Sequence, residues 1–146
     1  MFKIITPIGF NNMVDGGRVA SQIATLLNNN NNLYKEHNGY TISNSGCLYI
    51  VYMIHTEVVG TTCIQIEEQG LTRNKHTSVD PLFRRRGIGR ILVSEAINNC
   101  QTRNMYVTIR ETNHPSIGLY SSFGFSFVKC YDNNGNKIIV LGRRIK

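Results

Sequence analysis

Two hydrophobic periods occur along the chain and predict a mixture of strands and helices. Apolar and β-branched runs bounded by turn residues indicate strands, whereas apolar residues three and four positions apart indicate amphipathic helices. The predicted strands cover residues 2–6, 47–55, 58–67, 72–79, 105–110, 126–131 and 137–143. The predicted helices cover residues 13–27 and 114–122, and a third begins near Ile88.

This order of elements predicts an α/β (α+β) domain with one central sheet flanked by helices. The chain has 146 residues, which suits one domain, and no repeat or linker divides it. Residues 72–79 are unusually polar, so their position between other elements predicts a strand more strongly than their composition does. The polar stretch 28–45 is predicted to be a solvated loop, with a short second helix left open and with Leu33 and Tyr34 as its candidate anchors.

Composition and charge narrow the classes of partner. The net charge is +7, which permits nucleic-acid binding, but the basic residues are scattered apart from residues 84–90 and the last four positions. We therefore expect a polyanionic small molecule, and not nucleic acid, as the main ligand. The chain has no apolar run of 18 residues, so we expect no membrane span.

Cysteine usage indicates a reducing compartment. Cys47, Cys63, Cys100 and Cys130 are widely spaced without a CxxC pair, which favours free thiols over a metal site. The first residues lack the pattern of a secretory signal. We expect an intracellular, cytoplasmic protein that binds no metal.

The strongest candidate for chemistry is an arginine- and glycine-rich segment between a strand and a helix, here termed the arginine–glycine segment (residues 84–90). It contains Arg84, Arg85, Arg86, Gly87, Ile88, Gly89 and Arg90. The first N–H groups of a helix lack partners inside the helix, and the helix dipole makes that end electropositive. Glycines allow an anion to approach the backbone, and arginines supply fork-shaped donors. The segment therefore predicts a diphosphate site.

Two common phosphate motifs fit this segment poorly. No G-x-x-x-x-G-K-[ST] string is present, and a dinucleotide fingerprint would need a third glycine where Leu92 stands. The segment instead resembles the [QR]-x-x-G-x-[GA] acyl-CoA loop of the GNAT superfamily of N-acetyltransferases, with Arg84, Gly87 and Gly89 at the signature positions. The preceding Val79-Asp80-Pro81-Leu82-Phe83 is similar to the lead-in found in that family. The resemblance implies a mostly antiparallel sheet of about seven strands.

A second motif supports the same resemblance. Residues 113–125 read NHPSIGLYSSFGF, and a similar pattern occurs in many GNAT proteins. Asn113 is suited to cap the helix and to contact a ligand, with Ser116 three positions later. Gly124 is suited to end the helix in a left-handed turn. The resemblance implies that Tyr120 protonates the departing CoA thiolate; the alternative is a core tyrosine with its hydroxyl at the surface.

The resemblance implies an acetyl-CoA-dependent N-acetyltransferase domain over residues 1–146 that acts by direct transfer to a primary amine in a ternary complex. It also implies that the backbone near Val79 holds the pantetheine arm and that the sheet opens between the strand ending there and residues 105–110. Acetyl-CoA is then the co-substrate, and the amine acceptor is not specified by the sequence. A homodimer is left open.

The general base is the weak part of the pattern. Some relatives carry a glutamate on the strand before the loop, whereas residues 74–78 here contain no carboxylate. His76 is the candidate base, with Glu67 or Glu68 acting through water as an alternative. The missing carboxylate also supports a second hypothesis, in which the chain is a catalytically silent acyl-CoA-binding or protein-interaction module.

Overall fold

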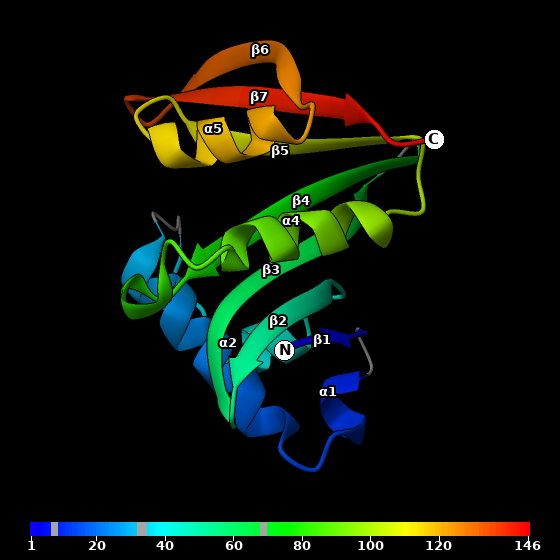
Figure 1. The fold of residues 1–146 in the computed structure, drawn as a ribbon, viewed down its shortest axis with the longest axis vertical. Coiled ribbons are helices and arrows are strands. Elements are labelled where there is room, and N and C mark those ends of the chain that lie inside the picture. Colours follow the sequence, from blue (N-terminus) through cyan, green and yellow to red (C-terminus); the bar gives the residue numbers. More distant parts are fainter. Residues whose placement is uncertain (7–8, 32–34, 68–69) are drawn as a thin grey trace.

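One twisted sheet forms the centre of the molecule in a computed structural model that describes residues 1–6, 9–31, 35–67 and 70–146 (Figure 1). Its strand order is β1-β2-β3-β4-β5-β7-β6. Every neighbouring pair is antiparallel except β4 and β5, which are parallel. The strands are β1 (Phe2–Ile5), β2 (Leu48–Ile54), β3 (Glu57–Glu67), β4 (Leu71–Val79), β5 (Asn104–Arg110), β6 (Ser126–Asn133) and β7 (Asn136–Arg144). The predicted mostly antiparallel sheet of seven strands is confirmed.

Helices cover both faces of this sheet (Figure 1). They are α1 (Gly9–Asn12), α2 (Gly16–Asn30), α3 (Gly39–Ser43), α4 (Ile88–Asn98) and α5 (His114–Ser122), with a 3-10 turn η2 (Pro81–Phe83) before α4. The side chains of β2 alternate between the two faces, as a strand requires. Tyr49 and Val51 join the core under α2, whereas Ile50 joins the core with α4 and α5.

The boundaries of α2 differ from the predicted residues 13–27. The helix begins at Gly16 and continues to Asn30, and it is closed by a bond from the N–H of Asn31 to the carbonyl of Leu27. Three asparagines expected in the loop are therefore helical. Val14, which falls within the predicted helix, lies before α2 and is fully exposed. Packing of the buried face stabilises these asparagines in the helix despite their low propensity.

The short helix left open within residues 28–45 is present as α3. Asn38 caps it by accepting a hydrogen bond from the N–H of Thr41, while the Thr41 hydroxyl accepts one from the N–H of Asn38. This reciprocal capping box explains why so short a helix forms in a polar stretch. The candidate anchors Leu33 and Tyr34 lie outside the described residues.

Several of the polar side chains of β4 are buried. Thr72, Asn74 and Ser78 are all buried in the sheet. Because buried polar groups need partners, such a strand is expected to hold a hydrogen-bonded network. The network around Asn74 forms part of the site described below.

Candidate active site

The sheet opens between β4 and β5. Their parallel pairing is limited to Leu71–Arg73 on β4 and Asn104–Tyr106 on β5. Beyond these positions β4 continues to Val79 and pairs with β3, while β5 pairs with β7. Figure 1 shows the two strands diverging toward the side where β4 ends. The opening that the resemblance implied is present.

A bulge in β4 lies beside this opening. The register with β3 shifts between Lys75 and Ser78, so that His76 and Thr77 both lie opposite Thr62. His76 has a φ of 56°, in the left-handed region that non-glycine residues seldom adopt. Bulges of this kind redirect side chains at the edges of sites. Here the bulge sends two consecutive side chains of β4 to different cores.

One of these side chains, Thr77, belongs to a buried hydrogen-bonded network around Tyr120. The Tyr120 hydroxyl donates to Oδ1 of Asn74 and lies 2.9 Å from Oγ1 of Thr77. The Asn74 amide in turn donates to Oγ1 of Thr62 at 2.7 Å and to the carbonyl of Cys63 at 2.9 Å. Tyr120 is 2% exposed, so its hydroxyl is not at the surface. Burial raises the pKa of this phenol, and the hydrogen bonds from Thr77 and Thr62 partly counter the rise.

The other side chain, His76, faces the core under α2. Its Nδ1 lies 3.4 Å from the Tyr49 hydroxyl, and its ring packs edge-on against His37 with 4.8 Å between centroids. Burial, followed by the charge of Lys75, lowers the pKa of His76 to about 3. The imidazole is therefore neutral at pH 7, and it is also a weak base.

The arginine–glycine segment follows directly from β4. Asp80 caps η2 by accepting a hydrogen bond from the N–H of Leu82 at 2.9 Å. Nε of Arg84 donates to the carbonyl of Val79 at 3.0 Å, which folds the segment back onto the strand end. Gly87 has a φ of 79° and begins α4 without a side-chain cap. The first N–H groups of α4 consequently point outward beside exposed arginines.

Arginine side chains surround this helix end. The guanidinium of Arg86 stacks on Phe83 at 5.1 Å, and that of Arg90 stacks on Phe123 at 4.8 Å and donates to Oγ of Ser122. Among the described residues, the only ion pairs are Arg18–Asp15 and Lys137–Glu111. The arginines of the segment, including Arg85 with its φ of 64°, therefore remain available to an anionic ligand.

The two residues that follow Gly87 have different roles in the fold. The Ile88 side chain is buried against Gly60 of β3, so only the backbone of Ile88 is available to a ligand. A methyl group added at Gly89 would meet only Leu119, at the ordinary distance of 3.5 Å. The fold therefore does not require glycine at position 89, although glycine weakens a helix by about 1 kcal/mol relative to alanine. Close approach of a ligand is a physical reason for it.

The start of α5 is organised as the sequence predicts. Oδ1 of Asn113 accepts a hydrogen bond from the N–H of Ser116 at 3.3 Å, which caps the helix, and Gly124 has the left-handed φ of 85°. Leu119 beside Gly89 joins this helix to α4. The structure thus brings the predicted site residues of segment 79–90 close to those of α5. The side chain of His76, in contrast, faces the core under α2.

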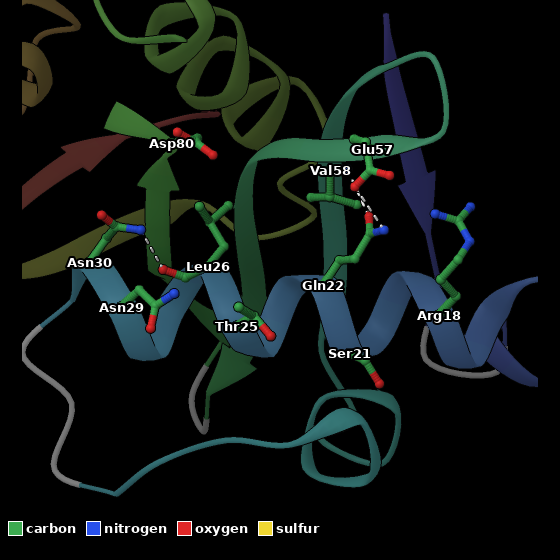
Figure 2. A pocket seen from close by; sticks show the side chains of 10 residues that line it. All are labelled: Arg18, Ser21, Gln22, Thr25, Leu26, Asn29, Asn30, Glu57, Val58 and Asp80. Atoms are coloured by element: carbon green, nitrogen blue, oxygen red, sulfur yellow. Dashed lines mark hydrogen bonds between the residues drawn. The ribbon is translucent and has the colours of Figure 1, made fainter. Parts of the chain in front are cut away.

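A separate polar cavity of about 320 Å³ lies between α2 and the ends of β3 and β4 (Figure 2). Gln22 bridges it, with Oε1 accepting from the N–H of Val58 at 2.9 Å and Nε2 donating to Glu57 at 3.1 Å. Asp80, which precedes η2, lies at its opposite end (Figure 2). Sequence reasoning did not identify this cavity, because its lining residues come from segments far apart in the chain.

Residues 22–125, more than half of the chain, match the family model described as "Acetyltransferase (GNAT) family". The chain belongs to this family. The residue matches in the arginine–glycine segment and in α5 both lie within the matched region. The GNAT resemblance of the sequence is confirmed, and acyl transfer is the class of activity that membership supports.

Two relatives and one solved structure illustrate the similarity. The chain is 40% identical over 52 residues to the [ribosomal protein bS18]-alanine N-acetyltransferase of Salmonella typhimurium, covering 34% of this chain and 35% of that protein. It is 29% identical over 99 residues to the N-alpha-acetyltransferase RimI of Mycobacterium tuberculosis, covering 68% and 59%. Both matches span less than two thirds of the curated relatives' lengths. The structure of yncA from Salmonella typhimurium with acetyl-CoA has the same fold, with a TM-score of 0.78, 14% identity and coverage of 100% and 94%.

The remaining features of this GNAT protein concern its cysteine thiols, possible metal-binding groups and possible membrane-spanning helices. Cys47, Cys63 and Cys100 are buried free thiols, as expected, whereas Cys130 is exposed. The described residues contain no group of three His, Cys, Asp or Glu side chains placed to hold a metal. No helix among residues 1–6, 9–31, 35–67 and 70–146 is long and apolar enough to span a membrane.

Proposed function

We propose that this GNAT protein transfers an acetyl group from acetyl-CoA to a primary amine, by direct transfer in a ternary complex. The observation that carries the proposal is that three features lie next to one another: the opening of the sheet, the uncapped start of α4 and the buried phenol of Tyr120. The exposed N–H groups at the start of α4 can bind an anionic diphosphate, and the strand end at Val79 can bind a pantetheine arm. The Tyr120 hydroxyl can protonate a leaving sulfur.

The proposed binding roles follow the order of the chain. The N–H groups at Gly87, Ile88 and Gly89 hold the pyrophosphate, aided by Arg84, Arg85, Arg86 and Arg90. Backbone groups of Val79 align the pantetheine arm. Asn113 and Ser116, at the start of α5, contact the same arm from the other side of the opening. Acetyl-CoA supplies the activated thioester, and no metal is needed for this chemistry.

The proposed catalytic step needs one acid and one proton acceptor. The amine nitrogen forms the new bond to the acetyl carbon as the bond from carbon to sulfur breaks, and the Tyr120 hydroxyl gives its proton to the sulfur. The amine loses its proton through a water molecule to His76, the proposed base, which passes it on to solvent, and a proton from solvent returns to the Tyr120 oxygen. His76 is neutral and can therefore accept a proton. Because its pKa is low, it passes that proton on to water and does not retain it.

The acceptor class has support from relatives. Two matched proteins are named as a [ribosomal protein bS18]-alanine N-acetyltransferase and an N-alpha-acetyltransferase, which makes a peptide amine the first acceptor to test. A primary amine must lose its proton before attack, so the rate of transfer is expected to rise with pH until the amine is neutral.

Two linked measurements test the proposed function. Thermal unfolding with acetyl-CoA at 100 times its dissociation constant is expected to show about 2.7 kcal/mol of stabilisation. Release of free CoA thiol in the presence of N-terminal peptides is then expected to depend on both substrates and on Tyr120. Stabilisation without any thiol release from a broad amine panel would contradict the transferase and favour the silent acyl-CoA-binding module. No stabilisation would contradict both.

A further inference from the structure

A second cavity, of about 710 Å³, lies over β4, β5, β6 and β7. Met105, Val107, Ile109 and Leu141 pack in the core with α5, so the intervening side chains of these strands face the opposite side of the sheet. Tyr106 and Thr108 line the cavity from β5, and Val140 lines it from β7. The cavity therefore occupies the face of the sheet away from α5.

Cationic side chains surround this cavity. The side chains of Arg73, Lys129 and Arg144 line it, whereas the side chain of Arg143 lies beside Gly124 on the α5 face, and no Asp or Glu occurs among the residues that line it in the described part of the chain. Glu67 accepts from the hydroxyl of the lining residue Tyr106 at 3.2 Å, and the backbone oxygen of Lys146 accepts from Nε of Arg144 at 2.9 Å. The cavity thus has an excess of positive charge, which disfavours a cationic ligand and favours an anionic one.

Arg73 has a donor directed to no protein group. One of its terminal nitrogens donates to Oγ1 of Thr108 at 3.0 Å, which fixes the guanidinium over the Tyr106 ring at 6.0 Å. Its Nε is buried and has no hydrogen-bond partner. A buried donor without a partner is unfavourable, so the guanidinium of Arg73 is a group at which a ligand carboxylate is expected to gain affinity.

The floor of the cavity and part of its rim are apolar. Val140 is buried, whereas Val128 and Tyr131 of the edge strand β6 remain 60% and 43% exposed beside the cations. Charged donors above an apolar floor suit a chain that carries both carboxylates and apolar side chains. A free phosphate or a simple sugar would leave the apolar part unused.

The position of the cavity relates it to the proposed reaction. Arg73 directly precedes Asn74, which holds the Tyr120 hydroxyl, and alternation along β4 places these two side chains on opposite faces. The pairing of β4 with β5 ends at Arg73 and Tyr106. A ligand in the cavity therefore lies next to the point where the sheet opens toward the phenol.

We propose that this cavity binds the acidic segment of a peptide acceptor, with Asp or Glu side chains following the amine that is acetylated. The inference rests on the proposed function for the role of the amine, but the binding site itself does not depend on turnover. Carboxylates contact Arg73, Lys129 and Arg144, while apolar side chains rest on Val128 and Val140.

Binding is tested first without turnover. Two peptides labelled at their C-termini with fluorescein differ only in Asp and Glu against Asn and Gln at the second to fourth positions after an N-terminal alanine. Fluorescence anisotropy is expected to give at least about tenfold tighter binding of the acidic peptide, a preference that weakens as salt rises. Equal affinities would overturn the proposal. Tighter binding of a 12-nucleotide single-stranded RNA than of the acidic peptide would also overturn it.

Variants locate the site. Lys129→Gln with Arg144→Gln removes two exposed cations of the cavity and is expected to abolish the preference, and Arg73→Gln is expected to weaken it separately. Lys3→Gln with Lys35→Gln removes the same charge from exposed positions outside the cavity and is expected to leave the preference intact. An equal loss in the control variant would overturn the assignment to the cavity.

Kinetics separate this inference from the proposed function. A higher kcat/KM for the acidic peptide in the unmodified protein, lost in the Lys129 and Arg144 variant, supports both. Acetylation of both peptides with equal kcat/KM overturns the acidic preference and leaves the transferase standing. Selective binding of the acidic peptide without its acetylation supports the cavity and contradicts the transferase.

Discussion

The hydroxyl of Tyr120 donates its hydrogen to the carboxamide oxygen of Asn74, 46 positions away in the sequence. This bond joins α5 to β4 beneath the opening of the sheet, and Thr77 provides a second partner for the same hydroxyl. For the proposed acid role, the phenol hydrogen must rotate from Asn74 toward the leaving sulfur while Thr77 continues to hold the oxygen. The arrangement positions an acid whose raised pKa keeps it protonated.

Tyr120→Phe tests the acid directly. The change removes the proton donor and keeps the ring that packs edge-on against Phe125 at 5.2 Å. Loss of a general acid is expected to lower kcat by about 100-fold or more, with a change in acetyl-CoA dissociation constant of less than about threefold. Steady-state kinetics and direct binding measure the two effects. A variant with unchanged kcat would remove Tyr120 from the proposed mechanism.

Asn74→Leu tests the residue that holds the phenol. The substitution leaves Thr62 and the carbonyl of Cys63 without their donor in a buried site. We expect the free energy of unfolding to fall by about 1–3 kcal/mol and kcat to fall more than the affinity for acetyl-CoA. Urea unfolding and kinetics provide the readouts, with Asn29→Leu on the exposed face of α2 as the control. Unfolding at the same urea concentration as the unmodified protein would show that the network contributes nothing.

His76 gives a prediction for the dependence of stability on pH. Its pKa is about 3 in the folded protein and about 6.5 when unfolded, so between these values the unfolded chain binds more protons. Stability must therefore rise with pH in this window, and it is complete above the unfolded pKa. Lowering the pH from 7 to 5 is expected to cost about 1–2 kcal/mol through this group.

Urea unfolding of His76→Gln at the two pH values measures that contribution. The variant is expected to lose less stability on acidification than the unmodified protein, whereas the exposed control His114→Gln behaves like the unmodified protein. Identical pH dependence in all three proteins would contradict the burial argument. The same His76 variant tests the proposed base, for which a fall in kcat of about 100-fold is expected.

Local patterns in the sequence were sufficient for part of this site. Gly87 at the start of α4 and Asn113 at the cap of α5 each act within a few residues of their own position, so motif spacing predicts them. The amphipathic pattern likewise predicts the helix that follows the arginine–glycine segment. Features that depend on neighbours along the chain are the ones a single sequence can supply.

The remaining features depend on contacts between distant segments. Asn74 is an ordinary polar residue in the sequence, and its role appears only when α5 places Tyr120 beside β4. The bulge that turns His76 toward Tyr49 and His37 has no local signal, because the histidine adopts a left-handed φ without a glycine. The cationic cavity over β4, β5, β6 and β7 was also missed, since its cations come from three strands whose order is set by the sheet.

Gly89→Glu tests the diphosphate site where the fold itself tolerates a side chain. The added Cβ would meet only Leu119 at 3.5 Å, so the variant is expected to fold, while its carboxylate repels a diphosphate at the start of α4. We expect acetyl-CoA to stabilise the unmodified protein by about 2.7 kcal/mol at 100 times its dissociation constant and to give no measurable shift in the variant. Gly17→Glu adds the same charge at an exposed position of α2 with open space around it, and it should retain the full shift. Retained binding in Gly89→Glu would place the diphosphate elsewhere, because no ligand could then depend on close approach to that helix turn.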